Sequence, residues 1–275
     1  MSQHRLDPEP RNQPLDALEQ AQREKYRGLY AGQPPPARDP KDYFTRQYEA
    51  RIELVRRYYA GGTVLDLCCG QGHYLPRVAE FAERVLGVDF SPEMLHQAKR
   101  LTAERACGNV ELVLGNANSL PLVDCSIELI YCFSSLYTIP RYQRTVSECA
   151  RVLVPGGLAI LDFGIRESLN TLVCRASPDL AVACHVPLRD IHRTLRGSGF
   201  GVEEDRAYQI LPLWGSGPWW LRPLLHPFWR WLMGRRVGGR MVDEWLSNAW
   251  PLRRFAFRHI MVCRKLSCGP LGTGV

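Results

Sequence analysis

The chain has 275 residues, 45% of them hydrophobic, and its 35 basic and 28 acidic residues give a formal net charge of +7. This length can bury a substantial core in one large domain or two small ones, and the mild basic excess permits an anionic partner without requiring one. No run of 18 apolar residues occurs, which argues against a membrane-spanning helix.

The ten cysteines contain no C-x-x-C pair, and several lie in apolar runs. A zinc site would need paired ligands at short spacing, so we expect no metal and interpret most cysteines as small buried side chains in a reducing, cytoplasmic compartment. The first 14 residues are polar and proline-rich, without the apolar core of a signal peptide.

Residues 1–40 are predicted to be a flexible segment with a short helix over 15–29 and a stiff linker over 33–40, where four prolines exclude a helix. A stronger helix is predicted from about 41 to 60. Its apolar residues recur every three or four positions, at Phe44, Tyr48, Ile52, Val55 and Tyr59. The pattern fits either a helix packed on the domain edge or a lid over an active site.

From residue 63 strands and helices alternate. Apolar runs predict strands over 63–67, 84–89, 110–114, 127–133 and 158–163. Helices are predicted between them over 73–83, 91–105 and 141–153. This alternation predicts an α/β fold with a mainly parallel sheet and helices on both faces.

The second half is less regular. Residues 165–187 are expected to be irregular and 188–195 helical, and the last strands are predicted over 201–210 and 255–265, with 255–265 at the edge of the sheet. A helical insertion over 211–254 separates these two strands, and residues 266–275 are expected to form a flexible tail.

Ligands of such sheets bind beyond the carboxyl ends of the strands. There the first strand carries Asp66 and a turn with Gly70 and Gly72, where the backbone can bend sharply and a ligand can approach closely. The second strand ends in Asp89, a candidate acceptor for the two hydroxyls of a ribose.

Further residues complete an adenosine-shaped site. Asn116 and Ala117 follow the third strand and could contact the edge of an adenine through a polar side chain and a backbone N–H. Phe90 and Met94 could form apolar walls or could be plain core, and Phe133 ends the fourth strand. The turn lacks G-x-G-x-x-G and the Gly-Lys-Ser/Thr of a P-loop, so a ligand without a pyrophosphate fits better.

Four motifs then carry a resemblance. The stretches 64–72 (VLDLCCGQG), 85–95 (VLGVDFSPEML), 115–121 (GNANSLP) and 151–158 (RVLVPGGL) resemble, in order and spacing, those of class I S-adenosylmethionine-dependent methyltransferases. The likeness covers about residues 43–210 and the final strand. It is closest to the broad group that includes quinone, sterol and natural-product methyltransferases.

The resemblance implies a methyltransferase domain over 41–265, with a Rossmann-like, seven-stranded sheet whose last strand is antiparallel. It also implies S-adenosylmethionine as cofactor. Two positions depart from the family pattern: Cys68 replaces the first glycine of the first motif, and Asn116 replaces the usual aspartate of the third.

Methyl transfer requires alignment of donor and acceptor in a dry pocket, and a general base is optional. His73, after the glycine turn, Tyr137, after the fourth strand, and His185 are the candidate bases.

The insertion holds all seven tryptophans, interleaved with leucines and arginines. It could be a cap with its own core, a lid over a small hydrophobic acceptor, or an interfacial segment that contacts a membrane. Its leucine content does not favour nucleic acid. Two other functions stay open: a lyase or cyclase that uses the same pocket without methyl transfer, and a non-catalytic module that binds a membrane or another partner.

Overall fold

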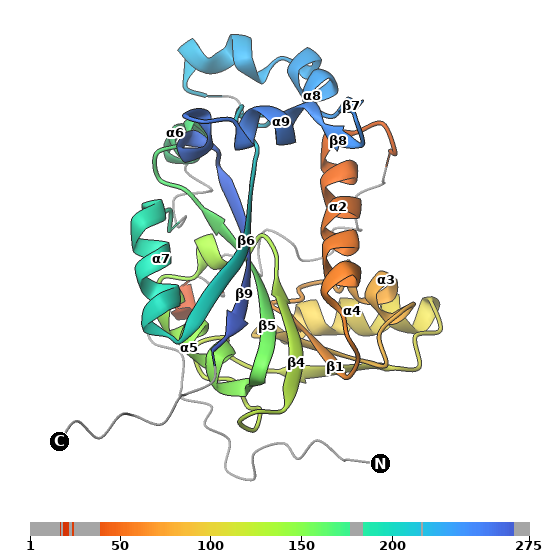
Figure 1. Ribbon diagram of the computed structural model, residues 1–275. Coiled ribbons are helices and arrows are strands. Elements are labelled where there is room, and N and C mark those ends of the chain that lie inside the picture. Colours follow the sequence, from red (N-terminus) through yellow and green to blue (C-terminus); the bar gives the residue numbers. More distant parts are fainter. Residues whose placement is uncertain are drawn as a thin grey trace, which may run out of the picture.

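The computed structural model describes residues 17, 19–21, 24, 39–176, 184–215 and 217–266. Its main sheet has seven strands in the order β3-β2-β1-β4-β5-β9-β6 (Figure 1). The strands are β1 (Thr63–Leu67), β2 (Arg84–Asp89), β3 (Val110–Leu114), β4 (Ile127–Cys132), β5 (Leu153–Gly164), β6 (Phe200–Tyr208) and β9 (Arg258–Lys265). The pairings from β3 to β5 are parallel, and β9 is antiparallel to β5, which confirms the predicted fold class.

The position of β9 corrects one expectation. It is not at the edge of the sheet but between β5 and β6, and it is antiparallel to both. Its apolar run from Ile260 to Cys263 is buried without alternation, as expected of a strand covered on both faces. The edge is β6, whose middle carries Glu203, Glu204 and other charged side chains that are suited to an exposed strand.

The helices of the first half follow the predicted order. They are α2 (Tyr43–Tyr58), α3 (Leu75–Ala79), α4 (Pro92–Glu104) and α5 (Tyr142–Val152). Ser91 caps α4 as its sequence indicates, since its side chain accepts a hydrogen bond from the Met94 N–H. The helix α3 is shorter than the predicted 73–83, because the Asn109 amide binds the carbonyls of Ala79 and Ala82 and ends it.

The second half contains α6 (Leu169–Ala176) and α7 (Leu188–Gly197). The helix α6 lies in a segment for which we predicted irregular structure, so that prediction was wrong. Its first turn has poor helix formers and is held by tertiary bonds instead, from the Asn170 amide to the Gln209 carbonyl and from the Thr171 hydroxyl to the Ile165 carbonyl. Near the N-terminus the described residues 17, 19–21 and 24 are helical; the rest of the predicted helix, the linker up to 38 and the tail after 266 lie outside the described residues.

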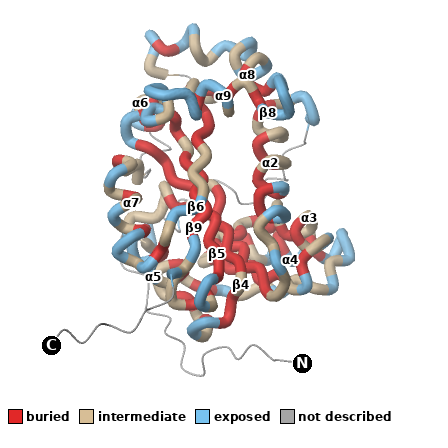
Figure 2. Tube along the Cα trace, in the orientation of Figure 1, coloured by how far each residue is buried: buried red, intermediate tan, exposed pale blue. Residues whose placement is uncertain are grey.

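Two apolar cores lie on the two faces of the sheet. One joins the sheet to α5 and α7, and the other joins it to α2, α3, α4 and the insertion. Figure 2 shows that the strands of the sheet are largely buried, whereas much of the insertion is exposed or half-buried. The second core places α2 beside the carboxyl ends of the strands.

The insertion contains the short elements η3 (Trp219–Leu225), α8 (Pro227–Met233), α9 (Val242–Asn248) and η4 (Leu252–Phe255), with a small hairpin of β7 (Arg236–Val237) and β8 (Arg240–Met241). It packs against the start of α2 (Figure 1). The buried Tyr43 hydroxyl donates to Asp243 at 2.7 Å, Arg230 pairs with Asp42, and Arg46 donates to the Gly234 carbonyl. The insertion and α2 therefore form one wall.

Candidate functional site

A cavity of about 630 Å³ lies at the carboxyl ends of the strands. Its lining comes from the turn after β1, the ends of β2, β3 and β4, the helix α2, and two arginines of the C-terminal part, Arg230 and Arg258. Nine of the ten residues predicted to bind a cofactor line it: Asp66, Cys68, Gly70, Asp89, Phe90, Met94, Asn116, Ala117 and Phe133.

The turn after β1 has a left-handed backbone at Cys68 (φ 61°) and Gly70 (φ 52°). A side chain is strained in this region by roughly 1–3 kcal/mol, which explains why glycine suits the position that Cys68 occupies. A Cβ built on Gly70 would meet no atom within 4 Å, so this side of the turn faces open space. Such an exposed turn lets a ligand approach the backbone closely.

Gly72 has a different role. It does not line the cavity; a Cβ there would stand 2.9 Å from the Ala98 Cβ of α4, and its φ is +79°. Gly72 therefore allows the turn to pack against α4. Its predicted contact with a cofactor stays a prediction.

The side chain of Asp89 connects the end of β2 to the turn after β1. Its Oδ2 accepts from the Gly70 N–H at 2.9 Å, and its Oδ1 accepts from the Ser91 N–H at 2.9 Å. Burial raises the pKa of this carboxyl, and the backbone N–H groups of Ser91, Gly70 and Phe90 partly offset that effect.

Asp66 is also buried beside the cavity, and one of its carboxylate oxygens, Oδ2, has no hydrogen-bond partner among the described residues. Burial raises its pKa to about 8, the Tyr131 hydroxyl opposes the shift, and the nearby Asp89 adds to it. An uncompensated buried carboxyl is costly, so a cationic ligand group near Asp66 would be stabilised.

Beyond β3, a residue from the N-terminal segment enters the site. Glu19 lines the cavity and accepts hydrogen bonds from the side-chain amides of Asn118 at 2.7 Å and Asn116 at 3.3 Å. The amide oxygen of Asn116 accepts from the Asn118 N–H at 2.9 Å. A carboxylate thus stands beside the position where Asn116 replaces the family's aspartate.

Of the apolar residues that line the cavity, Met94 and Phe133 are also buried, whereas Phe90 is half-buried. Met94 and Phe133 are 7% and 5% exposed, and Phe133 stacks on Tyr131. Met94 therefore belongs to the core and to the pocket wall at once, so the two interpretations that the sequence left open do not exclude each other for this residue.

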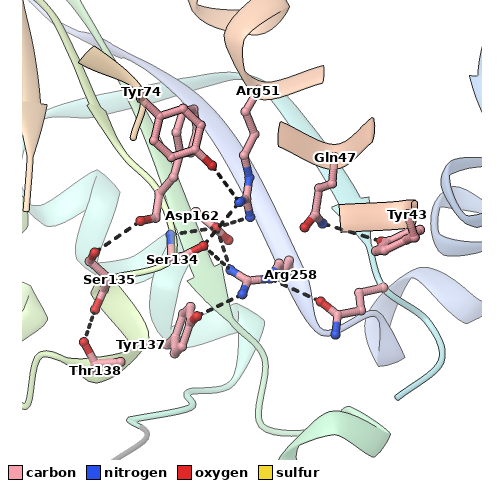
Figure 3. A network of polar contacts seen from close by, with 12 residues as sticks. Tyr43, Gln47, Arg51, Tyr74, Ser134, Ser135, Tyr137, Thr138, Asp162 and Arg258 are labelled. Carbon is pink, nitrogen blue, oxygen red and sulfur yellow. Dashed lines mark hydrogen bonds and ion pairs between the residues drawn. The ribbon is translucent and has the colours of Figure 1, made fainter. Parts of the chain in front are cut away.

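Figure 3 shows a polar network at the other end of the cavity. Arg51 of α2 and Arg258 of β9 both bind Oδ2 of Asp162 on β5, at 2.8 and 2.7 Å. The Ser134 N–H donates to the same oxygen at 3.0 Å. Arg51 also donates to the Tyr74 hydroxyl, and Arg258 to the Tyr137 hydroxyl.

The three candidate bases lie in different environments. His73 lines the cavity, and its backbone carbonyl accepts from the Tyr48 hydroxyl at 2.9 Å. Tyr137 is outside the lining, with its ring under the Arg258 guanidinium at 4.9 Å. The catalytic roles of His73 and Tyr137 stay predictions.

His185 is also outside the cavity lining, hydrogen-bonded to the Thr171 hydroxyl at 2.8 Å and edge-on to Phe257. Burial and the charges of Arg258 and Arg175 lower its pKa to about 4, so its ring is neutral at pH 7.

Two further properties concern only the part of the chain that the structure describes. No group of three or more His, Cys, Asp or Glu side chains there could hold a metal ion. No helix among those residues has the length and apolar character needed to cross a membrane.

Sequence reasoning missed several lining residues: Gln47, Arg51, Ser134, Ser135, Arg230 and Arg258. One signal was available for Arg51. It lies between Tyr48 and Ile52 on the apolar face of α2, where an arginine is expected only if it finds partners inside the protein. Nothing comparable marked Arg258.

Comparison with known proteins agrees with this geometry. Residues 64–157 match the family model described as a methyltransferase domain. The surrounding sheet has the Rossmann-like fold of class I S-adenosylmethionine-dependent methyltransferases, as the sequence motifs implied.

Among individual proteins, the chain is 34% identical over 122 residues to the demethylmenaquinone methyltransferase of Geobacillus kaustophilus, a match that covers 42% of this chain and 52% of the relative. The chain thus spans about half the length of the curated relatives it matches.

Two solved structures share the fold over most of their length. The [4+2]-cyclase SpnF is 19% identical with a TM-score of 0.61, covering 90% of this chain and 96% of that one. Magnesium protoporphyrin IX methyltransferase from Synechocystis PCC 6803, solved with bound SAH, is 17% identical with a TM-score of 0.56, covering 88% and 93%.

Proposed function

We propose that this protein is an S-adenosylmethionine-dependent methyltransferase that acts on a small, hydrophobic acceptor. The observation that carries the proposal is the single cavity that joins the turn after β1, the acid Asp89 and the wall made by α2. The names of the curated relatives support a quinone-like ring as the acceptor.

The residues present fit the cofactor. In this proposal Asp89 would accept from the ribose hydroxyls, Asn116 and Ala117 would contact the adenine, and the amino-acid portion would lie against the backbone at Gly70; all four residues line the cavity, which supports these roles. Because its Oδ2 has no hydrogen-bond partner among the described residues, Asp66 is the carboxyl whose burial a cationic amino group of the ligand would compensate.

Bound S-adenosylmethionine would supply a methyl group on a positively charged sulfur. This chain's residues would hold the acceptor in line with that methyl and keep water out. Phe44, Tyr48 and Phe133 would provide the apolar surface for a ring. His73, a histidine that lines the cavity, is the candidate to take a proton. A phenolic acceptor already ionised when bound would need no base.

Calorimetric titration of the purified protein with S-adenosylhomocysteine tests the proposal. We expect saturable binding with one site per chain. Absence of binding for both S-adenosylmethionine and its demethylated product at millimolar concentration would refute it. Mass spectrometry separates methyl transfer from a lyase or cyclase reaction, because only a methylated product gains the mass of one CH₂ group.

We further propose that the insertion contacts an anionic lipid surface. The insertion, residues 211–254, contains seven arginines and two acidic residues, Asp243 and Glu244. Asp243 is buried, whereas Trp219 and Trp250 are 77% and 92% exposed. Exposed aromatic rings among arginines match the interfacial region of a membrane in polarity and charge. Because the insertion shares a wall with α2, the same segment would also cover the acceptor end of the cavity.

A further inference from the structure

The acceptor end of the cavity contains more positive than negative charge. Arg51 and Arg258 share one acidic partner, Asp162, and their side chains are 7%, 11% and 0% exposed, respectively. No other acidic side chain in the described residues lies within ion-pair distance of either guanidinium. This group therefore has a formal charge of +1 in a buried setting.

The other partners of the two arginines do not neutralise that charge. They are the hydroxyls of Ser134, Tyr74 and Tyr137 and the amide oxygen of Gln209. Burial alone would lower the pKa of each guanidinium, but Asp162 and the tyrosine oxygens hold both values above normal, so both remain charged. A buried cation without a counter-charge is costly and stabilises any anion that reaches it.

The hydrogen-bonding capacity of the group is also incompletely used. Nε of Arg51 and Oδ1 of Asp162 are buried without a hydrogen-bond partner among the described residues. All the bonds that Asp162 receives fall on Oδ2. A network built only for stability would be expected to satisfy these atoms.

Arg51 and Arg258 both line the cavity, whereas Asp162 does not. Arg51 lies over the ring of Phe133, with 5.4 Å from Cζ to the ring centroid. Phe44 and Ile139 line the same cavity. A planar, apolar ligand that carries an anionic oxygen would match both the apolar lining and the positive charge of this surface.

We propose that Arg51 and Arg258 bind an ionised oxygen of the acceptor, so that the acceptor is an apolar ring with a phenolate, enolate or carboxylate group. This inference rests on the proposed methyltransferase function and specifies its substrate class. The two arginines determine specificity, because a neutral ring of the same shape leaves their charge uncompensated.

A cofactor carboxylate is the other possible source of such an anion. The place of Arg258 favours the acceptor: it lies on β9, opposite Gly164 at the end of β5, and the strand order puts β4 and β5 between β9 and β1. Of the adenosine-side residues, Asp89 is the last residue of β2 and Asn116 follows β3, and both strands lie on the other side of β1.

The test uses a matched pair of probes, 2-naphthoate and its neutral analogue 2-naphthamide, titrated into the full chain with and without S-adenosylhomocysteine. We expect the unaltered protein to bind 2-naphthoate at least about tenfold more tightly. In Arg258→Met the preference should fall to near unity, and Arg258→Lys should keep part of it. Arg264→Met is the matched control, since Arg264 is on the same strand but 44% exposed and paired with Glu203, and it should leave the preference unchanged.

Equal binding of the two probes by the unaltered protein would overturn the proposal, and so would a preference that persists in Arg258→Met. The first result needs no variant, so the proposal stays testable if Arg258→Met does not fold. If Arg258→Met weakens S-adenosylhomocysteine but not 5′-methylthioadenosine, which lacks the carboxylate, the arginines bind the cofactor instead. If S-adenosylhomocysteine does not bind at all, the proposed function fails, whatever the probes show.

Discussion

The Asp89 carboxylate accepts a hydrogen bond from the Gly70 N–H at 2.9 Å, which ties the end of β2 to the turn after β1. Both residues line the cavity, so this bond fixes two parts of the candidate cofactor site relative to each other. The other carboxylate oxygen of Asp89 accepts a hydrogen bond from the Ser91 N–H at the start of α4. One side chain therefore sets the position of a turn, a strand end and a helix.

Replacing Asp89 by asparagine should break one of its two hydrogen bonds, to the Gly70 N–H or to the Ser91 N–H. The amide would present NH₂ to one of two N–H donors, leaving a buried donor unpaired at a cost of about 1–3 kcal/mol. We expect S-adenosylhomocysteine to bind about tenfold more weakly or worse, measured by calorimetry, and the urea midpoint to fall. The control is Glu111→Gln on the neighbouring strand, which is exposed and should change neither. Unchanged binding in Asp89→Asn would show that Asp89 does not contribute to cofactor binding.

Stability should depend on pH through Asp66. Its folded-state pKa of about 8 lies above the unfolded value of 3.8, so the folded protein binds the proton more tightly. The stability contributed by the neutral carboxyl is full below about pH 4 and is lost as pH rises to about 8, by at most on the order of 5 kcal/mol. Urea unfolding of the cofactor-free protein should show this decline, and Asp66→Asn should flatten it. Parallel pH profiles for the two proteins would contradict the assignment.

Glu19 should contribute to cofactor binding, because its carboxylate lies beside Asn116, the position where the family has an acid. We expect Glu19→Ala to weaken S-adenosylhomocysteine binding several-fold, on the scale of one hydrogen bond to a charged group. Glu24→Ala is the matched control, because Glu24 is an exposed acid that is also helical and lies five positions further along the chain. Equal affinities of the two variants would exclude a role for Glu19.

Gly72 and Gly199 allow backbone strain to be separated from crowding. Both have φ +79°, but a Cβ at Gly199 would meet no atom within 4 Å, whereas one at Gly72 would stand 2.9 Å from Ala98. Gly199→Ala should cost about 1 kcal/mol of unfolding free energy from strain alone. Gly72→Ala should cost roughly 1–3 kcal/mol more through overpacking. Similar losses in the two variants would show that the turn can move away from α4.

The insertion should bind anionic vesicles. We expect co-sedimentation with phosphatidylglycerol-containing vesicles and not with pure phosphatidylcholine, decreasing at high salt. The double variant Trp219→Ser, Trp220→Ser should lose most of this binding, since both side chains are at least half exposed. Arg189→Gln with Arg193→Gln on α7, both highly exposed and outside the insertion, is the control. Equal binding to both vesicle types would contradict an electrostatic contact.

The strands could be predicted closely because their signals are local. Apolar runs bounded by caps and turns, such as Ser91 before α4, specify each unit of the parallel sheet without reference to distant residues. The position of β9 inside the sheet could not be predicted from β9 alone. It follows only once the charged residues of β6 identify β6 as the edge strand. The helix α6 was missed because the residues of its first turn have low helix propensity and it is stabilised by side-chain hydrogen bonds, one of them to the distant Gln209 carbonyl and another to the nearby Ile165 carbonyl.

The cofactor side of the site was accessible to sequence reasoning for the same reason. Asp66 and Asp89 lie at the carboxyl ends of β1 and β2, and Gly70 and Asn116 lie in the turns just after β1 and β3, so the sheet alone brings them together. The acceptor side is built by side chains from α2, β5 and β9 together with the backbone just after β4. Arg51 and Arg258 come from opposite ends of the chain, and only tertiary packing reveals that they share Asp162.

The contacts of α2 with the insertion have a consequence for engineering. Tyr43 is bonded to Asp243, Asp42 to Arg230 and Arg46 to the Gly234 carbonyl, and none of these residues lies within the matched methyltransferase segment 64–157. A chimera that exchanges the insertion alone would leave buried Tyr43 without its carboxylate. Substrate preference should therefore transfer between related proteins only when both flanking segments are exchanged together.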